Sequence, residues 1–204
     1  MNQQQTKSSF VEICLFGIVS KEKVNDLQER LACVAESTSK KHDLITPFSC
    51  EEAKDGSSRK RKINFLWKLD KDTRISQVEY YGSIQGKHDA IVRSYSTSLV
   101  DKNNSREFLI ELGLKNELPE KSDVCDRRGF RFELQDGIFV EIFQHYRKGK
   151  DIAEEGENHV FYIGKIEHHA NIVPTEALII DLSKKFSNFV TVSKEIPTTM
   201  KYLT

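Results

Sequence analysis

Two strand-like segments separated by a short turn constrain the fold more than any other part of the sequence. The segments are residues 129–134 (GFRFEL) and residues 138–146 (IFVEIFQHY). The dipeptide Asp-Gly between them suits a two-residue type I′ turn, so we predict an antiparallel hairpin in which Phe132 faces Glu141. In this register one face of the hairpin contains Phe130, Phe132, Leu134, Phe139, Glu141 and Phe143.

The second strand of this hairpin is apolar on its other face as well. That face contains Ile138, Val140 and Ile142. A strand that is apolar on both faces must be covered on both faces. Either a helix of the same chain or a partner protein supplies the cover. We therefore take Ile138, Val140 and Ile142 as candidate partner-interface residues.

Hydrophobic periodicity elsewhere predicts more strands and three helices. Apolar residues alternate with polar ones between Ile63 and Leu69, as in a half-buried strand, whereas Val24, Leu27 and Leu31 recur at helical spacing. Strands in sequence order with three interspersed helices favour an α+β fold, in which a predominantly antiparallel, barrel-like sheet of about eight strands is packed by about three helices. Besides the hairpin, the predicted strands are near 10–19, 63–70, 74–81, 89–100 and 159–169, and the predicted helices near 21–36, 104–113 and 174–189.

The chain is predicted to form one domain with polar ends. Residues 1–9 are expected to be a disordered N-terminal segment, residues 10–192 a single barrel domain, and residues 193–204 a C-terminal tail. Residues 37–62 are predominantly polar, so we predict that most of this stretch is a mobile loop within the domain, with a short strand around residues 44–50 as the alternative for that part.

A short basic run lies at the end of this predicted loop. It consists of Arg59, Lys60, Arg61 and Lys62. Such a run is a candidate nuclear localisation signal or phosphate-binding patch. The alternative is an ordinary solvated loop of basic composition.

Composition excludes several classes of function. Lys and Arg total 31 and Asp and Glu total 31, so the formal net charge is zero. A general nucleic-acid binder needs a basic excess, so no direct sequence-specific nucleic-acid contact is predicted. The hydrophobic share of 38% is too high for a disordered chain. Apolar runs fall well short of the ~20 residues that cross a bilayer, and no signal-peptide pattern is present, so no membrane contact is expected.

The sequence lacks the motifs of the common catalytic and metal sites. It has no GxSxG, no HExxH and no glycine-rich phosphate loop with a lysine. The adjacent His168 and His169 would point to opposite faces of a strand, so they do not form a chelating pair. We therefore predict no catalytic residues, no metal site and no cofactor. The cysteines are widely spaced, as expected of small buried hydrophobes, at Cys14, Cys33, Cys50 and Cys125.

Glu141 is the one chemical oddity on the predicted core face. It is a candidate metal-binding or acid/base carboxylate inside a barrel; alternatively, the face opens to solvent there or a nearby Arg or Lys pairs with it. Catalysis needs convergent groups. The other strand glutamates, Glu12, Glu79, Glu133 and Glu167, fall mostly at positions that we predict to face outward.

The strand 11–19 (VEICLFGIV) leads into an amphipathic helix, and 88–96 (HDAIVRSYS) precedes 106–114 (REFLIELGL) and the hairpin at 129–147. This order of segments resembles the family of subunit 18 of the Mediator complex, the coactivator of RNA polymerase II. The family's basic "H-A-x-V-R" strand has its counterparts in His88, Ala90, Val92 and Arg93. Leu112-Gly113 matches the helix end of the family and Gly137 its hairpin turn.

The resemblance implies a barrel-like α+β fold similar to the RNA 5′-triphosphatase tunnel, without enzymatic activity. It also implies a heterodimer with Mediator subunit 20, docking on the C-terminal helix of subunit 8, indirect contact with RNA polymerase II and a nuclear location. The expected function is that of a non-enzymatic adaptor in the head module, supporting transcription regulation.

The alternative function is a metal-dependent polyphosphate or RNA 5′-triphosphatase that uses the barrel interior. Such an enzyme binds metal through glutamates that alternate along a strand. Here Glu12 is followed on its face by Cys14, and Glu141 is flanked by Phe139 and Phe143. These neighbours supply no second hard oxygen ligand and argue against a water-filled tunnel.

Overall fold

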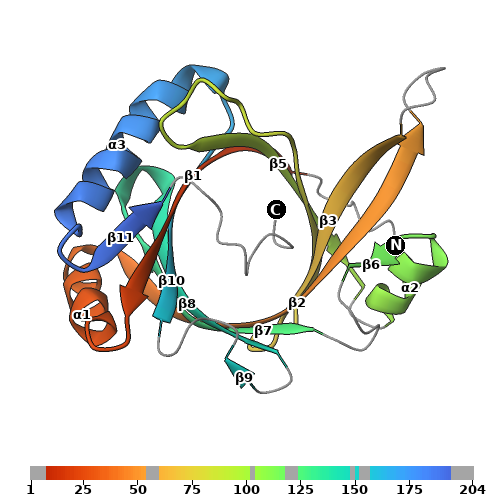
Figure 1. The fold of residues 1–204 in the computed structure, drawn as a ribbon, viewed down its shortest axis with the longest axis horizontal. Helices are drawn as coiled ribbons and strands as arrows, with labels where there is room; N and C mark the ends of the chain where they lie inside the picture. Colours follow the sequence, from red (N-terminus) through yellow and green to blue (C-terminus); the bar gives the residue numbers. More distant parts are fainter. Residues whose placement is uncertain are drawn as a thin grey trace.

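Eight of the described strands close into one antiparallel barrel. The computed structural model describes residues 8–53, 60–101, 104–117, 124–147, 150–151 and 157–193. The strand order is β10-β1-β5-β4-β3-β2-β7-β8, and pairing of β8 with β10 closes the ring (Figure 1). These strands are β1 (Ser8–Ser20), β2 (Ser37–Ala53), β3 (Lys60–Asp70), β4 (Ser76–Tyr81), β5 (Ile91–Val100), β7 (Cys125–Glu133), β8 (Ile138–Arg147) and β10 (Glu157–Ile166).

Three helices and three short strands lie around this barrel in the described residues. Figure 1 shows two of the helices side by side on the wall formed by β1, β10 and β8, and the third on the opposite side, beside β2 and β3. The predicted α+β barrel with about eight strands and three helices is therefore confirmed. The helices are α1 (Val24–Val34), α2 (Ser105–Glu111) and α3 (Ile172–Lys185), and the short strands are β6 (Lys115–Asn116), β9 (Lys150–Asp151) and β11 (Val190–Ser193). No helix in the described part of the chain has the length and apolar character to cross a membrane.

The main hydrophobic core lies between the barrel wall and the helices α1 and α3. Leu27 and Leu31 of α1 and Ile179 of α3 are fully buried in it. They pack against outward-facing side chains of β1, β8 and β10. The barrel wall is therefore apolar on its outer surface here, because the helices rather than water cover it.

The same core contains the three residues predicted to form a partner interface. Ile138 is 6% exposed, Val140 0% and Ile142 1%. All three belong to the cluster that α1 and α3 cover. The interface prediction for these residues is therefore wrong. The sequence allowed either a helix of the same chain or a partner protein to cover them, and in the structure the chain's own helices do so.

The central hairpin has a longer turn than predicted. Its connection is a three-residue 3₁₀ turn, Gln135–Gly137, in which Asp136 and Gly137 have φ angles of 60° and 69°. The backbone N–H of Leu134 donates to the carbonyl of Ile138 at 2.8 Å. The turn uses the predicted Asp-Gly pair in the left-handed region but includes one more residue.

That additional residue changes the pairing of the two strands. Arg131 lies opposite Glu141, and Phe132 lies opposite Val140. The predicted pairing of Phe132 with Glu141 is wrong by one position. Because side chains alternate between faces, a one-residue shift moves every side chain of one strand to the other face. It brings Phe132 into the outer core and Arg131 to the inside of the barrel.

The predicted mobile loop at 37–62 is also wrong over most of its length. Residues 37–53 form β2, and residues 60–62 are the first part of β3. The sequence signal was weak because these residues are mainly polar, yet β2 pairs with β7 through residues 37–45 and with β3 through residues 43–53. Neighbours on both sides supply the backbone hydrogen bonds that a polar strand needs.

Several sequence predictions concern residues outside the described ranges. Arg59 lies outside them, and Lys60, Arg61 and Lys62 are described only as backbone, paired with residues 51–53. The proposed N-terminal segment is described only for residues 8 and 9, which belong to β1. The proposed tail is described only for Ser193, the last residue of β11.

Candidate functional site: the charged barrel interior

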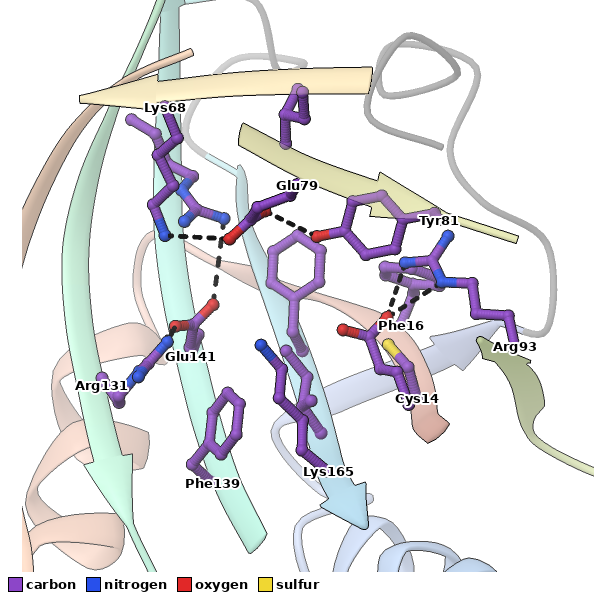
Figure 2. A pocket seen from close by; sticks show the side chains of 15 residues that line it. Cys14, Phe16, Lys68, Glu79, Tyr81, Arg93, Arg131, Phe139, Glu141 and Lys165 are labelled. Carbon is purple, nitrogen blue, oxygen red and sulfur yellow. Dashed lines mark hydrogen bonds and ion pairs between the residues drawn. The ribbon is translucent and has the colours of Figure 1, made fainter. Parts of the chain in front are cut away.

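Inward-facing side chains of the barrel strands surround a small polar cavity. Strand alternation places every second residue of each strand on this side. The cavity has a volume of about 60 Å³, which is room for a few water molecules. Figure 2 shows the charged residues among its lining, most of which lie in pairs. The lining residues are Glu12, Cys14, Phe16, Leu66, Lys68, Glu79, Tyr81, Arg93, Arg127, Arg131, Phe139, Glu141, Phe161, Ile163 and Lys165.

Glu141 is held by two arginines of the neighbouring strand. Its Oε1 accepts hydrogen bonds from Arg131 Nε at 2.8 Å and Nη2 at 2.5 Å. Arg127 Nη1 lies 3.8 Å from its Oε2. Burial by itself would raise the pKa of Glu141, but the positive charges of Arg131, Arg127 and Lys68 outweigh it and lower this pKa to about 2. Glu141 is therefore an ionised carboxylate at any physiological pH.

Arg127 links this pair to a second buried carboxylate. Its Nη2 and Nε donate to Asp43 Oδ2 at 2.6 and 3.2 Å. Lys68 Nζ lies 3.5 Å from the same oxygen. The guanidinium also stacks on Phe143, 3.9 Å from the ring centroid. Burial alone would lower the pKa of Arg127, but Asp43 and Glu141 raise it, so the group stays charged. Arg127 is thus fixed on every side.

Glu12 forms a separate pair with Arg93 across β1 and β5. Arg93 Nε and Nη2 donate to Glu12 Oε1 at 2.9 and 2.7 Å. The guanidinium stacks on Tyr81, 4.0 Å from the ring centroid. Both charged side chains are about 95% buried, and the pair is directly opposite in the sheet. A bidentate pair of this kind has good geometry for a buried site.

Glu79 accepts hydrogen bonds from three uncharged side chains and lies near one lysine. The hydroxyls of Tyr81 and Tyr95 donate to its two oxygens, each at 2.9 Å, and Gln77 Nε2 donates at 2.7 Å. Lys68 Nζ lies 4.0 Å away. Burial would raise the pKa of Glu79, but the positive charges of Lys68 and Lys165, the hydrogen bond from Tyr81 and the charge of Arg127 lower it overall. Glu79 therefore remains ionised, with both oxygens already engaged.

This arrangement leaves little capacity for a catalytic metal. A divalent ion such as Mg²⁺ or Ca²⁺ requires several oxygen ligands. In the part of the chain that the structure describes, no three His, Cys, Asp or Glu side chains converge on a common point. The carboxylates inside the barrel instead accept hydrogen bonds or ion pairs from Arg, Lys and Tyr. Their chemistry is that of a compensated salt-bridge network.

The sequence located only part of this site. Glu141 does lie inside the barrel with Phe139, as predicted, and among the alternatives left open the structure selects pairing with arginine. Glu133 and Glu167 are exposed, as predicted. Glu12 and Glu79 were predicted to face outward, and this is wrong, because both line the cavity.

The sequence argument against a water-filled tunnel considered only the apolar neighbours of Glu12 and Glu141 along their own strands. In the sheet, Arg93 and Lys165 lie opposite Glu12 on the two adjacent strands, and Arg131 lies opposite Glu141. One signal was available: Glu12 alternates with the buried Cys14, so the two belong to one face. Which face is inside depends on the closure of the barrel.

Comparisons with known proteins identify the fold. No protein-family model matches the sequence, and no curated protein matches it. Among solved structures, a chain of the Schizosaccharomyces pombe Mediator head module superposes with a TM-score of 0.67 at 12% identity, covering 89% of this chain and 97% of that chain. The chain shares its fold with a Mediator head subunit. The resemblance predicted from the sequence is thus confirmed as a structural similarity.

Other proteins share the barrel. PH1819 from Pyrococcus horikoshii superposes with a TM-score of 0.64 at 11% identity, covering 91% of this chain and 94% of that chain. A putative adenylyl cyclase from Hippeastrum, whose dominant activity is that of a triphosphatase, has a TM-score of 0.55 at 10% identity, covering 94% of both. At these identities the comparisons establish the architecture, and function must be argued from the site.

Proposed function

We propose that the chain is a non-enzymatic adaptor subunit of a Mediator head module. The observation that supports this most is the match to a head-module chain over nearly the full length of both proteins. In this role the barrel is a rigid body whose outer surface binds neighbouring subunits. The neighbours that the sequence resemblance implies are subunit 20, as a heterodimer partner, and the C-terminal helix of subunit 8.

The interior of the barrel is consistent with a structural role. Ion pairs join Glu12 to Arg93, Asp43 to Arg127 and Glu141 to Arg131, across neighbouring strands. The pairs Glu12–Arg93 and Asp43–Arg127 join strands that are more than 80 residues apart in sequence, and Glu141–Arg131 joins the two strands of the hairpin. Such pairs hold a barrel in one register, since a slip of either strand would separate buried charges. A protein that presents a fixed surface to several partners benefits from this rigidity.

The second candidate function is that of a metal-dependent triphosphatase. It is favoured by the similarity to the Hippeastrum triphosphatase and by the charged interior. Against it, Arg and Lys side chains already engage the carboxylates that would have to bind the metal. Freeing them would leave buried arginines without counter-ions, at a cost of about 3–5 kcal/mol for each broken pair. We therefore favour the adaptor.

The two functions can be separated by one pair of measurements on the full chain. First, the tagged protein is purified from its own cells at moderate salt, and co-eluting proteins are quantified by mass spectrometry. The adaptor proposal expects near-stoichiometric recovery of Mediator head subunits and a nuclear location. Recovery of the chain without them would contradict it.

Second, hydrolysis of tripolyphosphate is measured with Mg²⁺ and with Mn²⁺, using Glu141→Gln as the control. If the chain is an adaptor, the natural protein should show no metal-dependent hydrolysis of tripolyphosphate beyond that of Glu141→Gln. Activity that is present in the natural chain and lost in Glu141→Gln would instead support the triphosphatase.

A further inference from the structure

Among the described residues, the charged side chains that face the inside of the barrel do not balance. They comprise four carboxylates and five cationic groups, which gives one positive charge in excess. Eight of these groups take part in ion pairs with N–O distances of 4.0 Å or less. The ninth is Lys165. The carboxylates are Glu12, Asp43, Glu79 and Glu141, and the cations are Lys68, Arg93, Arg127, Arg131 and Lys165.

The ammonium group of Lys165 reaches the cavity without a counter-ion. In Figure 2 its side chain rises from β10 between Phe139 and Cys14 toward the centre of the site, and no ion pair is drawn to it. Within the described residues, it makes no hydrogen bond and no ion pair. Its contacts are with aromatic rings: Nζ lies 3.7 Å from the ring centroid of Tyr95 and 5.7 Å from that of Phe139.

An ammonium group in this position is costly unless something compensates it. Contact with an aromatic face recovers part of its hydration energy but does not cancel the charge. Burial lowers the pKa of Lys165, and the nearby Glu79, Glu12 and Glu141 oppose this effect without reaching ion-pair distance. Those carboxylates are held by other partners, so none is free to move to Lys165. The described residues that line the cavity include no further carboxylate, so we take a solute as the counter-ion.

We propose that the barrel interior binds one small, singly charged anion against Lys165. The excess of one charge among the described residues favours a valence of one, because a single negative charge balances these groups. The cavity of about 60 Å³ sets the size, which suits chloride or formate. The anion acts as an internal counter-ion of the barrel. This inference is independent of the proposed adaptor function, since it concerns the isolated chain.

The same surroundings disfavour a multiply charged ligand. Glu12, Glu79 and Glu141 all line the cavity; Arg93 donates hydrogen bonds to Glu12, and the pKa values of Glu79 and Glu141 are lowered. Every additional negative charge on the ligand would repel three carboxylates at short range in a medium of low dielectric constant. A polyphosphate would also exceed the volume available. The site therefore selects monovalent, compact anions.

Anion binding at this site has a measurable consequence for stability. A ligand that binds only the folded state stabilises it in proportion to the logarithm of its concentration above Kd. For a domain of this size the midpoint of thermal unfolding, Tm, should rise by about 2–5 °C between no anion and saturation. The rise should saturate, which distinguishes binding from general screening by salt.

The experiment follows Tm of the full chain while chloride or formate replaces gluconate at constant ionic strength and pH 7. Gluconate is too large for the cavity. We expect a saturable rise in Tm for the natural protein and no rise for Lys165→Met. Lys184→Met is the matched control, because Lys184 is exposed on α3 and its side chain is 71% accessible. It should keep the full response.

The decisive contrary results are equally specific. Equal anion responses in Lys165→Met and the natural chain would overturn the proposal, as would stronger stabilisation by tripolyphosphate than by formate at matched ionic strength. If Lys165→Met does not fold, ³⁵Cl line broadening on the natural protein replaces it. Broadening that formate displaces supports the site, and the absence of protein-dependent broadening refutes it. Neither result depends on whether Mediator subunits co-purify.

Discussion

Arg131 on β7 lies directly opposite Glu141 on β8 and binds its carboxylate through two nitrogens, at 2.8 and 2.5 Å. This pair exists only because the turn between the strands has three residues instead of two. A two-residue turn would place Phe132 opposite Glu141 and turn Arg131 outward. The length of one turn thus decides whether a buried carboxylate has a counter-ion.

Replacing Arg131 with methionine should destabilise the protein by about 3 kcal/mol. Glu141 would keep only Arg127, at 3.8 Å, and would become an incompletely compensated buried charge. The double variant Arg131→Met/Glu141→Leu should recover most of the loss, because it removes both charges. Urea unfolding of the natural protein, the two single variants and the double variant measures the coupling energy between Arg131 and Glu141. Additive effects in the cycle would show that the pair contributes nothing specific.

Acid should unfold the protein through Glu141. Its pKa is about 2 in the folded state against an ordinary value of 4.5, so the folded state resists protonation while the unfolded chain accepts the proton. The stabilisation is complete above about pH 4.5 and is lost as the pH falls toward 2. The shift corresponds to roughly 3 kcal/mol. In Glu141→Gln the free energy of unfolding should change less between pH 5 and pH 2.5. Parallel curves for the two proteins would contradict this assignment.

A buried histidine pair should produce a second pH dependence at higher pH. His145 Nδ1 lies 3.1 Å from His159 Nδ1, and His145 is fully buried. Burial first, then His159 and Arg127, lower the pKa of His145 well below 6.5. The unfolded chain therefore takes up the proton first, and stability should decline as the pH falls below about 6.5.

The variant His145→Leu tests this dependence because it removes the titrating group and keeps an apolar side chain. Its free energy of unfolding should vary less between pH 7 and pH 5 than that of the natural protein. Unfolding in urea at several pH values provides the comparison. If the free energy of unfolding of His145→Leu changes with pH as steeply as that of the natural protein, groups other than His145 cause the pH dependence.

Introducing a charge at Val140 should unfold the isolated chain. Val140 is fully buried between the barrel wall and the helices, so Val140→Asp places an unpaired carboxylate in the main core, at a cost above about 4 kcal/mol. Val173→Asp is the matched control, since Val173 is 69% exposed on α3. Circular dichroism should show a folded protein for the control alone. A folded Val140→Asp would reopen this strand as a partner surface.

Gly129 should not tolerate even a methyl group. A Cβ atom built there would lie 1.8 Å from the carbonyl oxygen of Ile142 on the neighbouring strand. Gly129→Ala must displace β7 from β8 and should cost about 2 kcal/mol or more. At Gly86 no atom lies within 4 Å of such a Cβ, so Gly86→Ala should leave Tm nearly unchanged. Similar Tm values for the two variants would show that the sheet relaxes freely at Gly129.

The comparison of sequence and structure shows where local patterns suffice. Alternation between Ile63 and Leu69 predicted a strand, and the structure contains β3 there. Val24, Leu27 and Leu31 predicted α1, and all three are buried against the barrel. Both patterns reflect burial of one face, which is a property of the segment itself. Only the part of β2 around residues 44–50, where Ile45 and Phe48 are buried, had a strand signal; the rest of β2 is mainly polar, and its neighbours in the sheet stabilise it.

The sequence by itself determined the α+β class and most of the strands and helices, because hydrophobic periodicity records which side of each segment avoids water. Only the tertiary structure decided that Arg131 meets Glu141, that Glu12 and Glu79 lie inside, and that Lys165 has no counter-ion. These relationships depend on register and on barrel closure. Both bring together residues distant in sequence, and no local pattern records those distances.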